Sequence, residues 1–340
     1  MTFSTQWKSS TTNALAAEPS AGDPHRGLSL RAVFVGPHGL RAGWRLLLFI
    51  GLVGILIGGL VLARSGGIQG FLDQQKQLRQ ITITPSLLGE SDAITFLIVC
   101  IATLVMAKIE RRKFGEYGLP LRRALSKEFC IGTAFGFSAI SGTLLAVFLL
   151  HGFRITGFAL HGTAIFSSAT AWVLAFVAVG LFEEFICRGY VQYTLASAVG
   201  FWPAAFVISG LFGLAHAFNP GETAVGAISA GLFGILLCFF LRRTGNLWCA
   251  VGFHAAWDWG QMFYGVADSG LQPYHNVFSS TFRGPAWLTG GSVGPEASVL
   301  TPIALVIVAL IFSHYYREDW RPSQQSHSTE RESLSVTAAS

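Results

Sequence analysis

The sequence predicts an all-α membrane protein, a polytopic bundle of about eight transmembrane helices. Hydrophobic residues make up 51% of the 340 residues and charged residues only 12%, whereas soluble domains usually contain about 25% charged residues. The apolar residues are also gathered in long runs, and a helix needs about 20 of them to cross a bilayer. The 39 glycines agree with this class, because glycine is frequent in transmembrane helices.

Eight apolar runs are predicted to span the membrane. The third, FCIGTAFGFSAISGTLLAVFLL, is the clearest, and the second is short. The fourth is unusual because it contains two glutamates and an arginine. In chain order, the runs cover residues 44–63, 93–109, 129–150, 168–195, 202–218, 224–241, 246–265 and 298–316.

The Lys and Arg residues predict the orientation of the bundle. Five lie before or at the start of the first run, seven lie between the end of the second run and the start of the third, two connect the sixth and seventh, and three follow the last. The connections on the opposite side hold five. Cytoplasmic connections are the richer in Lys and Arg, so both termini are predicted to be cytoplasmic. Short connections favour a bacterial inner (plasma) membrane protein.

Composition also limits the partners. The net charge of +5 comes from Lys and Arg beside the runs and does not indicate a nucleic-acid partner; the expected partner is the lipid bilayer. The five cysteines lie in or beside apolar runs, which argues against a disulfide framework or a zinc ribbon. Residues 1–40 are polar and are predicted to form a disordered cytoplasmic tail. No cleaved signal peptide is expected, because the first apolar run starts late and is long enough to span.

The charges of the fourth run lie in the segment LFEEFICRGY. Placing an Asp, Lys or Arg at membrane depth costs about 2.5–3.5 kcal/mol, so these residues need an explanation. Glu184 and Arg188 are four residues apart in the favourable order for a helical ion pair. Glu183 lies about 100° around the helix from Glu184 and has no local partner. A carboxylate of this kind is suited to general-base chemistry, although a structural charge cluster remains an equal alternative at this point.

Two more polar sites lie inside predicted spans. His216 ends the segment SGLFGLAH, and His254 and Asp258 share one helix face in HAAWD. At 1.5 Å per residue, Glu183, His216 and His254 are about 18, 20 and 12 Å from the cytoplasmic ends of their helices. We therefore expect these groups to meet in one layer of the bundle. A single histidine in a span is more often a packing residue, but three polar sites at similar depth favour a shared site.

The order of these motifs resembles a known family. EEFICR (183–188), FGLAH (212–216) and HAAWD (254–258) together resemble the CPBP intramembrane endopeptidases, the group of type II CAAX prenyl proteases and bacteriocin-processing (Abi-like) proteins. The upstream segment FGEYGLPL (114–121) is similar to one that often precedes this core. The resemblance covers roughly 110–265. It divides the chain into N-terminal helices 41–109, a protease-like core 110–265, an outer loop with the last helix 266–316, and a cytoplasmic tail 317–340.

The resemblance implies a role for each motif residue. Glu183 would be the base that activates a water molecule, and His216 would act with it or bind a metal. His254 and Asp258 would stabilise the oxyanion or complete a metal site. The supporting residues of the motifs would be Glu184, Arg188 and Phe212.

The resemblance leaves two mechanisms open. A divalent metal, zinc in the first place, would be bound by His216 and His254, with Glu183 or Asp258 as a further ligand, because imidazole and carboxylate groups suit zinc. The soluble zinc-protease motif H-E-x-x-H is absent from the sequence. A metal-free mechanism would use the same residues.

The function expected from the resemblance is an intramembrane endopeptidase that hydrolyses a peptide bond in a peptide, prenylated or membrane-protein substrate. One alternative is a proton-coupled transporter with Glu183 and the histidines as a relay, although the sequence shows no duplicated halves. The other is a non-catalytic membrane scaffold or immunity protein. Loop 266–297 is expected to cap the outer mouth of the bundle, with Asp268 and Glu222 exposed on the outer side.

Overall fold

The structure is a computed structural model that describes residues 34–36, 39–70, 72, 83–219, 221–272 and 274–316. The predicted tail 317–340 and most of the predicted tail 1–40 lie outside the described residues. Near the end of the latter, strand β1 (Val35–Gly36) pairs antiparallel with strand β2 (Gly39–Leu40).

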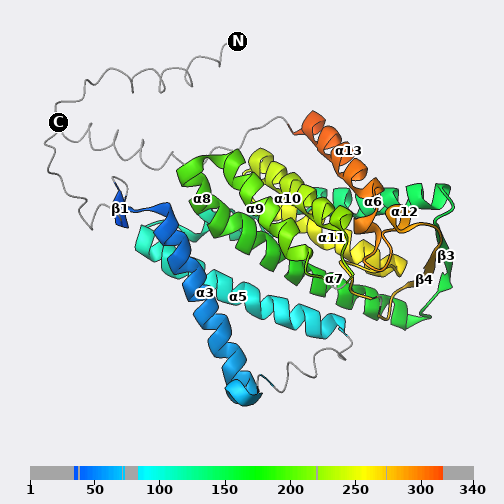
Figure 1. Cartoon of the computed structure of the whole chain (residues 1–340), viewed down its shortest axis with the longest axis horizontal. Coiled ribbons are helices and arrows are strands. Elements are labelled where there is room, and N and C mark those ends of the chain that lie inside the picture. The colour runs from blue at the N-terminus through cyan, green and yellow to red at the C-terminus, as the bar shows by residue number, and fades with distance from the viewer. Residues whose placement is uncertain are drawn as a thin grey trace, which may run out of the picture.

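Each of the eight predicted runs contains a helix, and the bundle is all-α apart from short strands (Figure 1). Within the described residues, five helical segments are long and apolar enough to cross a membrane: α3, α5, α6, the α7–α8 segment and α10. Helices α9 and α13 are apolar but shorter. The fold class is confirmed, while the count of eight spans stays a prediction. The helices are α3 (Ala42–Ser65), α5 (Pro85–Glu110), α6 (Lys127–Leu149), α7 (Thr163–Glu184), α8 (Gln192–Val199), α9 (Phe201–His216), α10 (Ala224–Thr244), α11 (Trp248–Tyr264) and α13 (Leu300–Tyr315).

Helix α5 begins earlier than the predicted start at residue 93. Thr84 caps it, because its hydroxyl accepts a hydrogen bond from the amide of Leu87 at 3.2 Å, and Pro85 occupies the first turn, where its missing N–H costs nothing. The first turns contain Glu90 and Asp92. The apolar run is therefore shorter than the helix.

The predicted continuous helix 168–195 is wrong in its middle. Helix α7 ends at Glu184, a π-helical segment η4 (Phe185–Val191) follows, and α8 begins at Gln192. Gly189 leaves helical geometry inside η4, and a Cβ atom there would lie 2.7 Å from the ring of Phe185. Such π segments are frequent at functional sites, and this one contains the arginine of the charged motif.

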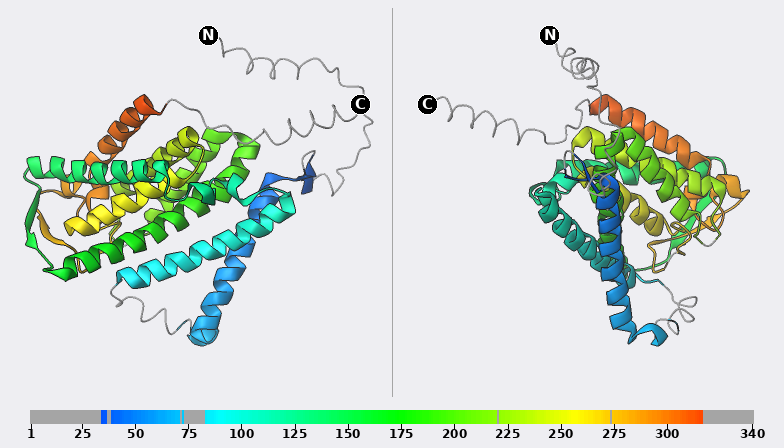
Figure 2. Two further views of the ribbon diagram at one scale, coloured as in Figure 1. Left: turned by 180° about the vertical axis from the view of Figure 1, so that it is seen from behind. Right: turned by 60° about the vertical axis from the view of Figure 1, so that its left-hand side comes forward.

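Helix α11 lies at the centre of the bundle, in contact with α6, α7 and α10 (Figures 1 and 2). Its crossing with α6 is close because Gly132 and Gly136 of α6 face the backbone of α11, and Gly252 of α11 faces the backbone of α6. Helix α3 is buried only through Phe49 and Val53, and its later part diverges from the bundle in Figure 1.

Short elements connect the helices at the two ends of the bundle. At one end, strand β3 (Phe153–Phe158) pairs antiparallel with β4 (Phe278–Phe282), and the same region contains α12 (Ala286–Thr289) and the 3-10 turn η5 (Pro295–Ala297). The 3-10 turns η2 (Phe114–Tyr117) and η3 (Leu121–Arg123) lie between α5 and α6. The β3–β4 end carries the loop that was predicted to cap the bundle.

Candidate active site

The four predicted catalytic residues line one cavity of about 340 Å³. Its walls come from α5, α7, α9, α10 and α11, and the loop after α11 covers one side. The depth comparison from the sequence therefore placed these residues on the correct helical levels. The polar and ring-bearing members of the α7, α9 and α11 walls are Phe176, Glu183, Phe212, His216, His254, Trp257 and Asp258.

The adjacent glutamates occupy different environments. The side chain of Glu183 is 29% exposed and faces the cavity, whereas that of Glu184 is 0% exposed. Glu184 accepts a hydrogen bond from Nη1 of Arg188 at 2.9 Å, so the predicted ion pair is present. Its partner arginine is also fully buried. Glu184 is thus held inside the bundle, and Glu183 is the one of the two glutamates that faces the cavity.

His254 connects the two glutamates to α11. Its Nδ1 lies 2.8 Å from Oε1 of Glu184, and a carboxylate can only accept a hydrogen bond, so Nδ1 carries the proton. The opposite nitrogen, Nε2, lies 3.7 Å from Glu183 and 3.5 Å from Asp258. These two distances are long for direct hydrogen bonds and suit proton exchange through small shifts or one water molecule.

Phe212 joins the second motif to the other two. The guanidinium carbon of Arg188 lies 4.5 Å from the Phe212 ring centroid, a cation–π contact. The same ring packs against His216, with centroids 4.5 Å apart. Nδ1 of His216 donates to the carbonyl of Phe212 at 2.9 Å, which leaves Nε2 as the acceptor of the neutral imidazole.

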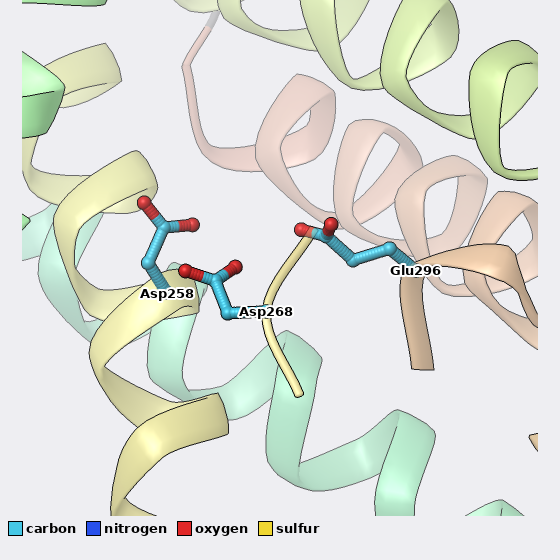
Figure 3. A group of neighbouring side chains, drawn as sticks. All are labelled: Asp258, Asp268 and Glu296. Atoms are coloured by element: carbon cyan, nitrogen blue, oxygen red, sulfur yellow. The ribbon is translucent and has the colours of Figure 1, made fainter. Parts of the chain in front are cut away.

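Asp268 and Glu296 complete an acidic group that the sequence did not predict. Asp268 was expected to be exposed, but it is 7% exposed because the loop after α11 folds back over the cavity. Carboxylate oxygens of Asp258, Asp268 and Glu296 lie within 4.8 Å of one another, and Figure 3 shows the three groups turned toward a common space. Burial, together with the nearby charges of Glu296 and Glu183, raises the pKa of Asp268 well above its ordinary value. No spacing motif in the sequence could indicate this contact.

Glu296 ties the loop to the central helix. Its Oε1 accepts hydrogen bonds from Trp257 Nε1 at 2.8 Å and Gln261 Nε2 at 3.1 Å. Its Oε2 accepts from the backbone amide of Ser269 at 3.1 Å and from the hydroxyl at 2.6 Å. Both oxygens therefore have two donors each, and this carboxylate fixes the cavity wall.

The zinc site predicted from the sequence stays a prediction. Among the described residues, Asp258, Asp268 and Glu296 form the one group of three potential ligands that lie mutually close, and neither His216 nor His254 belongs to it. Three carboxylates suit a hard oxygen-preferring cation better than zinc.

Comparison with protein families identifies the segment that carries these motifs. Residues 165–260 match the family model of the type II CAAX prenyl endopeptidase Rce1-like proteins. This segment is similar to the CAAX protease family. The matched segment of this CAAX protease-like chain runs from α7 to α11 and contains all three motifs, and it covers well under half of the 340 residues. Asp268 and Glu296 lie outside it. The search of curated proteins gave no match.

Proposed function

We propose that the chain is an intramembrane endopeptidase in which Glu183 activates a water molecule for attack on a peptide bond. The observation that carries this proposal is the division of labour between the adjacent glutamates: Glu184 is buried against Arg188, and Glu183 faces a cavity that also contains His216 and His254. A carboxylate beside two imidazoles in a recess of the bundle can take, hold and return a proton.

In the proposed reaction, a water molecule in the cavity gives a proton to Glu183 as its oxygen attacks the carbonyl carbon of the substrate. His216 supports the water molecule, because its Nε2 can accept the second hydrogen of the water. The C–N bond then breaks, and the leaving amine takes the proton from Glu183. Glu183 returns to its ionised form and the balance of atoms is complete.

His254 is the proposed donor to the oxyanion. Two carboxylates face its Nε2, and a third holds its Nδ1. In its doubly protonated form, Nε2–H would donate a hydrogen bond to the negative oxygen of the tetrahedral intermediate. Donors placed in advance in a site without bulk water are among the strongest contributions to acyl-transfer catalysis.

The proposed substrate is a peptide or a membrane protein whose scissile bond enters the cavity. The description of the matching family adds prenylated CAAX peptides as one candidate class. Cleavage of labelled peptides by the purified protein in liposomes tests the proposal. Movement of ions or solutes without cleavage would support the transporter alternative, and neither activity would favour a scaffold.

Replacing Glu183 by Gln should reduce peptide turnover by about a hundred- to ten-thousandfold, because Gln keeps the shape of the side chain but cannot take a proton. The variant should retain its thermal stability, since Glu183 is partly exposed to the cavity. Single-turnover cleavage and a melting curve of the same preparation measure both effects. Undiminished cleavage by this variant would contradict the role of Glu183.

Zinc held by His216 and His254 remains the second mechanism that the family resemblance allows. Metal analysis of the purified protein, with activity measured after chelation and after return of zinc, distinguishes the two. Full activity of metal-free protein would support the glutamate–histidine mechanism. Activity lost on chelation and restored by zinc would support the metal.

A further inference from the structure

The cavity carries a large excess of negative groups. Five carboxylates line it, whereas none of the described residues along its wall is Lys or Arg. Among the described residues of the wall, only His216 and His254 can carry a positive charge. Buried charges of one sign are unfavourable unless a proton or a cation compensates them. The five are Glu183, Glu222, Asp258, Asp268 and Glu296.

Asp258 and Asp268 are the least compensated pair. Asp258 is 5% exposed, and its nearest charged partner is Nε2 of His254 at 3.5 Å. Asp268 accepts a hydrogen bond from Gln261 Nε2 at 2.7 Å. By contrast, Glu296 already has two donors on each oxygen. The pair Asp258–Asp268 therefore retains most of the free acceptor capacity of the acidic group in Figure 3.

A second, independent feature of the same cavity indicates a ligand. Ser229 of α10 lines the cavity and is 1% exposed, and its hydroxyl has no hydrogen-bond partner in the structure. Buried hydroxyl groups are normally hydrogen-bonded. A bound molecule that supplies a donor would satisfy this hydroxyl as well as the two aspartates.

We infer that this cavity binds a substrate through a cationic side chain, Lys or Arg, which lies between Asp258 and Asp268. The inference rests on the proposed endopeptidase function and adds a substrate class to it. An ammonium group has three donors, which can serve the free acceptors of the two aspartates, and Ser229 is a further polar group without a partner in the same cavity. A divalent ion is less well matched, because Glu296 has no free oxygen acceptor to offer as a third carboxylate ligand.

The test is a comparison of paired peptides. The full chain in liposomes is incubated with a pooled peptide library. Each Lys-containing peptide has a partner with norleucine at the same position, because norleucine has a similar length but no charge. At one position near the cleaved bond, Lys peptides should be cut roughly ten- to a hundredfold faster, the range for a hydrogen bond to a charged group. Asp268→Asn should bring this ratio toward one, and Ser229→Ala should lower it in part.

A matched control uses a carboxylate outside the cavity. Glu90 of α5 is exposed and pairs with Arg64, so Glu90→Gln should leave the Lys-to-norleucine ratio unchanged. Cleavage of both peptide types at equal rates overturns the inference and leaves the endopeptidase function standing, as does a Lys preference that survives Asp268→Asn. A preference that disappears when divalent ions are added back to chelated protein would show an inorganic cation site instead, and would also overturn it.

A binding measurement separates this inference from the proposed function. Fluorescent Lys and norleucine peptides are titrated onto the Glu183→Gln variant, whose fold is checked by gel filtration. Tighter binding of the Lys peptide, lost in the Glu183→Gln, Asp268→Asn double variant, supports the cationic subsite even where no cleavage occurs. Equal binding of the two peptides overturns it.

Discussion

Two residues that are adjacent in the sequence differ in environment here because a helix turns by about 100° per residue. Glu184 points into the bundle, where it meets both Arg188 and His254, and Glu183 points into the cavity. Three further polar atoms of the buried network, the donors Nε and Nη2 of Arg188 and the acceptor Oε2 of Glu184, have no hydrogen-bond partner in the structure. This ion pair is therefore sensitive to the loss of either member.

Replacing Glu184 by Gln should lower the stability of the protein markedly. The change leaves the buried guanidinium of Arg188 without a charge partner, and removing one member of a buried pair costs roughly 3–5 kcal/mol. The melting temperature in detergent measures the effect. Glu90→Gln is the matched control, because its pair with Arg64 is exposed and surface pairs contribute about 0–1 kcal/mol. Equal stability of the two variants would contradict the structural role of Glu184.

Replacing Asp268 by Asn should stabilise the protein as the pH rises. Burial and the charges of Glu296 and Glu183 raise the pKa of Asp268 above its ordinary value of 3.8, so the folded state holds this proton more tightly than the unfolded state. The stability that the protonated carboxyl group of Asp268 contributes is fully present below pH 3.8. It is lost as the pH rises from 3.8 through the raised pKa of the folded state. The melting temperature of Asp268→Asn should therefore exceed that of the parent by a margin that grows from weakly acidic to neutral pH. A margin independent of pH would count against this account.

At the scale of the elements, the close crossing of α6 and α11 holds the histidine and aspartate of the third motif in place. A Cβ atom at Gly136 would overlap the carbonyl oxygen of Phe253, the residue before His254, whereas one at Gly142 of the same helix meets nothing within 4 Å. Small residues allow membrane helices to approach this closely. The position of the candidate site residues on α11 therefore depends on glycines that do not line the cavity.

Replacing Gly136 by Ala should lower both stability and cleavage. Overpacking of a tight contact costs typically about 1–3 kcal/mol, and here the relief requires α6 and α11 to separate, which displaces His254. Gly142→Ala should behave like the parent protein, because it adds the same methyl group to the same helix in open space. Melting temperature and peptide turnover of the two variants give the comparison. If Gly136→Ala has the melting temperature and peptide turnover of the parent protein, the α6–α11 crossing accommodates the methyl group without loss of stability or activity.

The sequence predicts local features of this molecule better than distant contacts. Apolar runs and helical spacing were enough for the eight helices and for the Glu184–Arg188 pair. The π segment was not predictable, because hydrophobic pattern does not distinguish a π turn from an α turn. The burial of Asp268 was also missed: it depends on Glu296, almost thirty residues later, meeting Trp257 and Ser269, and loop composition carries no record of such a contact.

At the scale of the whole molecule, the connections separate into two groups that match the predicted sides of the membrane. On the predicted outer side, β3 pairs with β4, and Asn219 donates to the carbonyl of Ser269 at 3.2 Å. On the predicted cytoplasmic side, Arg45 pairs with Glu110, and the amide of Leu247 donates to Gly118 at 2.7 Å. The loop that covers the cavity belongs to the first group, so it is expected to lie on the side away from the cytoplasm.

Labelling of single added cysteines tests this orientation. Gln272 lies exposed in the loop after α11, and Ala124 lies exposed between α5 and α6. In intact bacterial cells, a membrane-impermeant maleimide should label Gln272→Cys but not Ala124→Cys, because Lys- and Arg-rich connections stay in the cytoplasm. After the membrane is disrupted, both should react, and the parent chain with its five cysteines sets the background. Labelling of Ala124→Cys alone in intact cells would show the opposite orientation. The loop that covers the cavity would then lie on the cytoplasmic side.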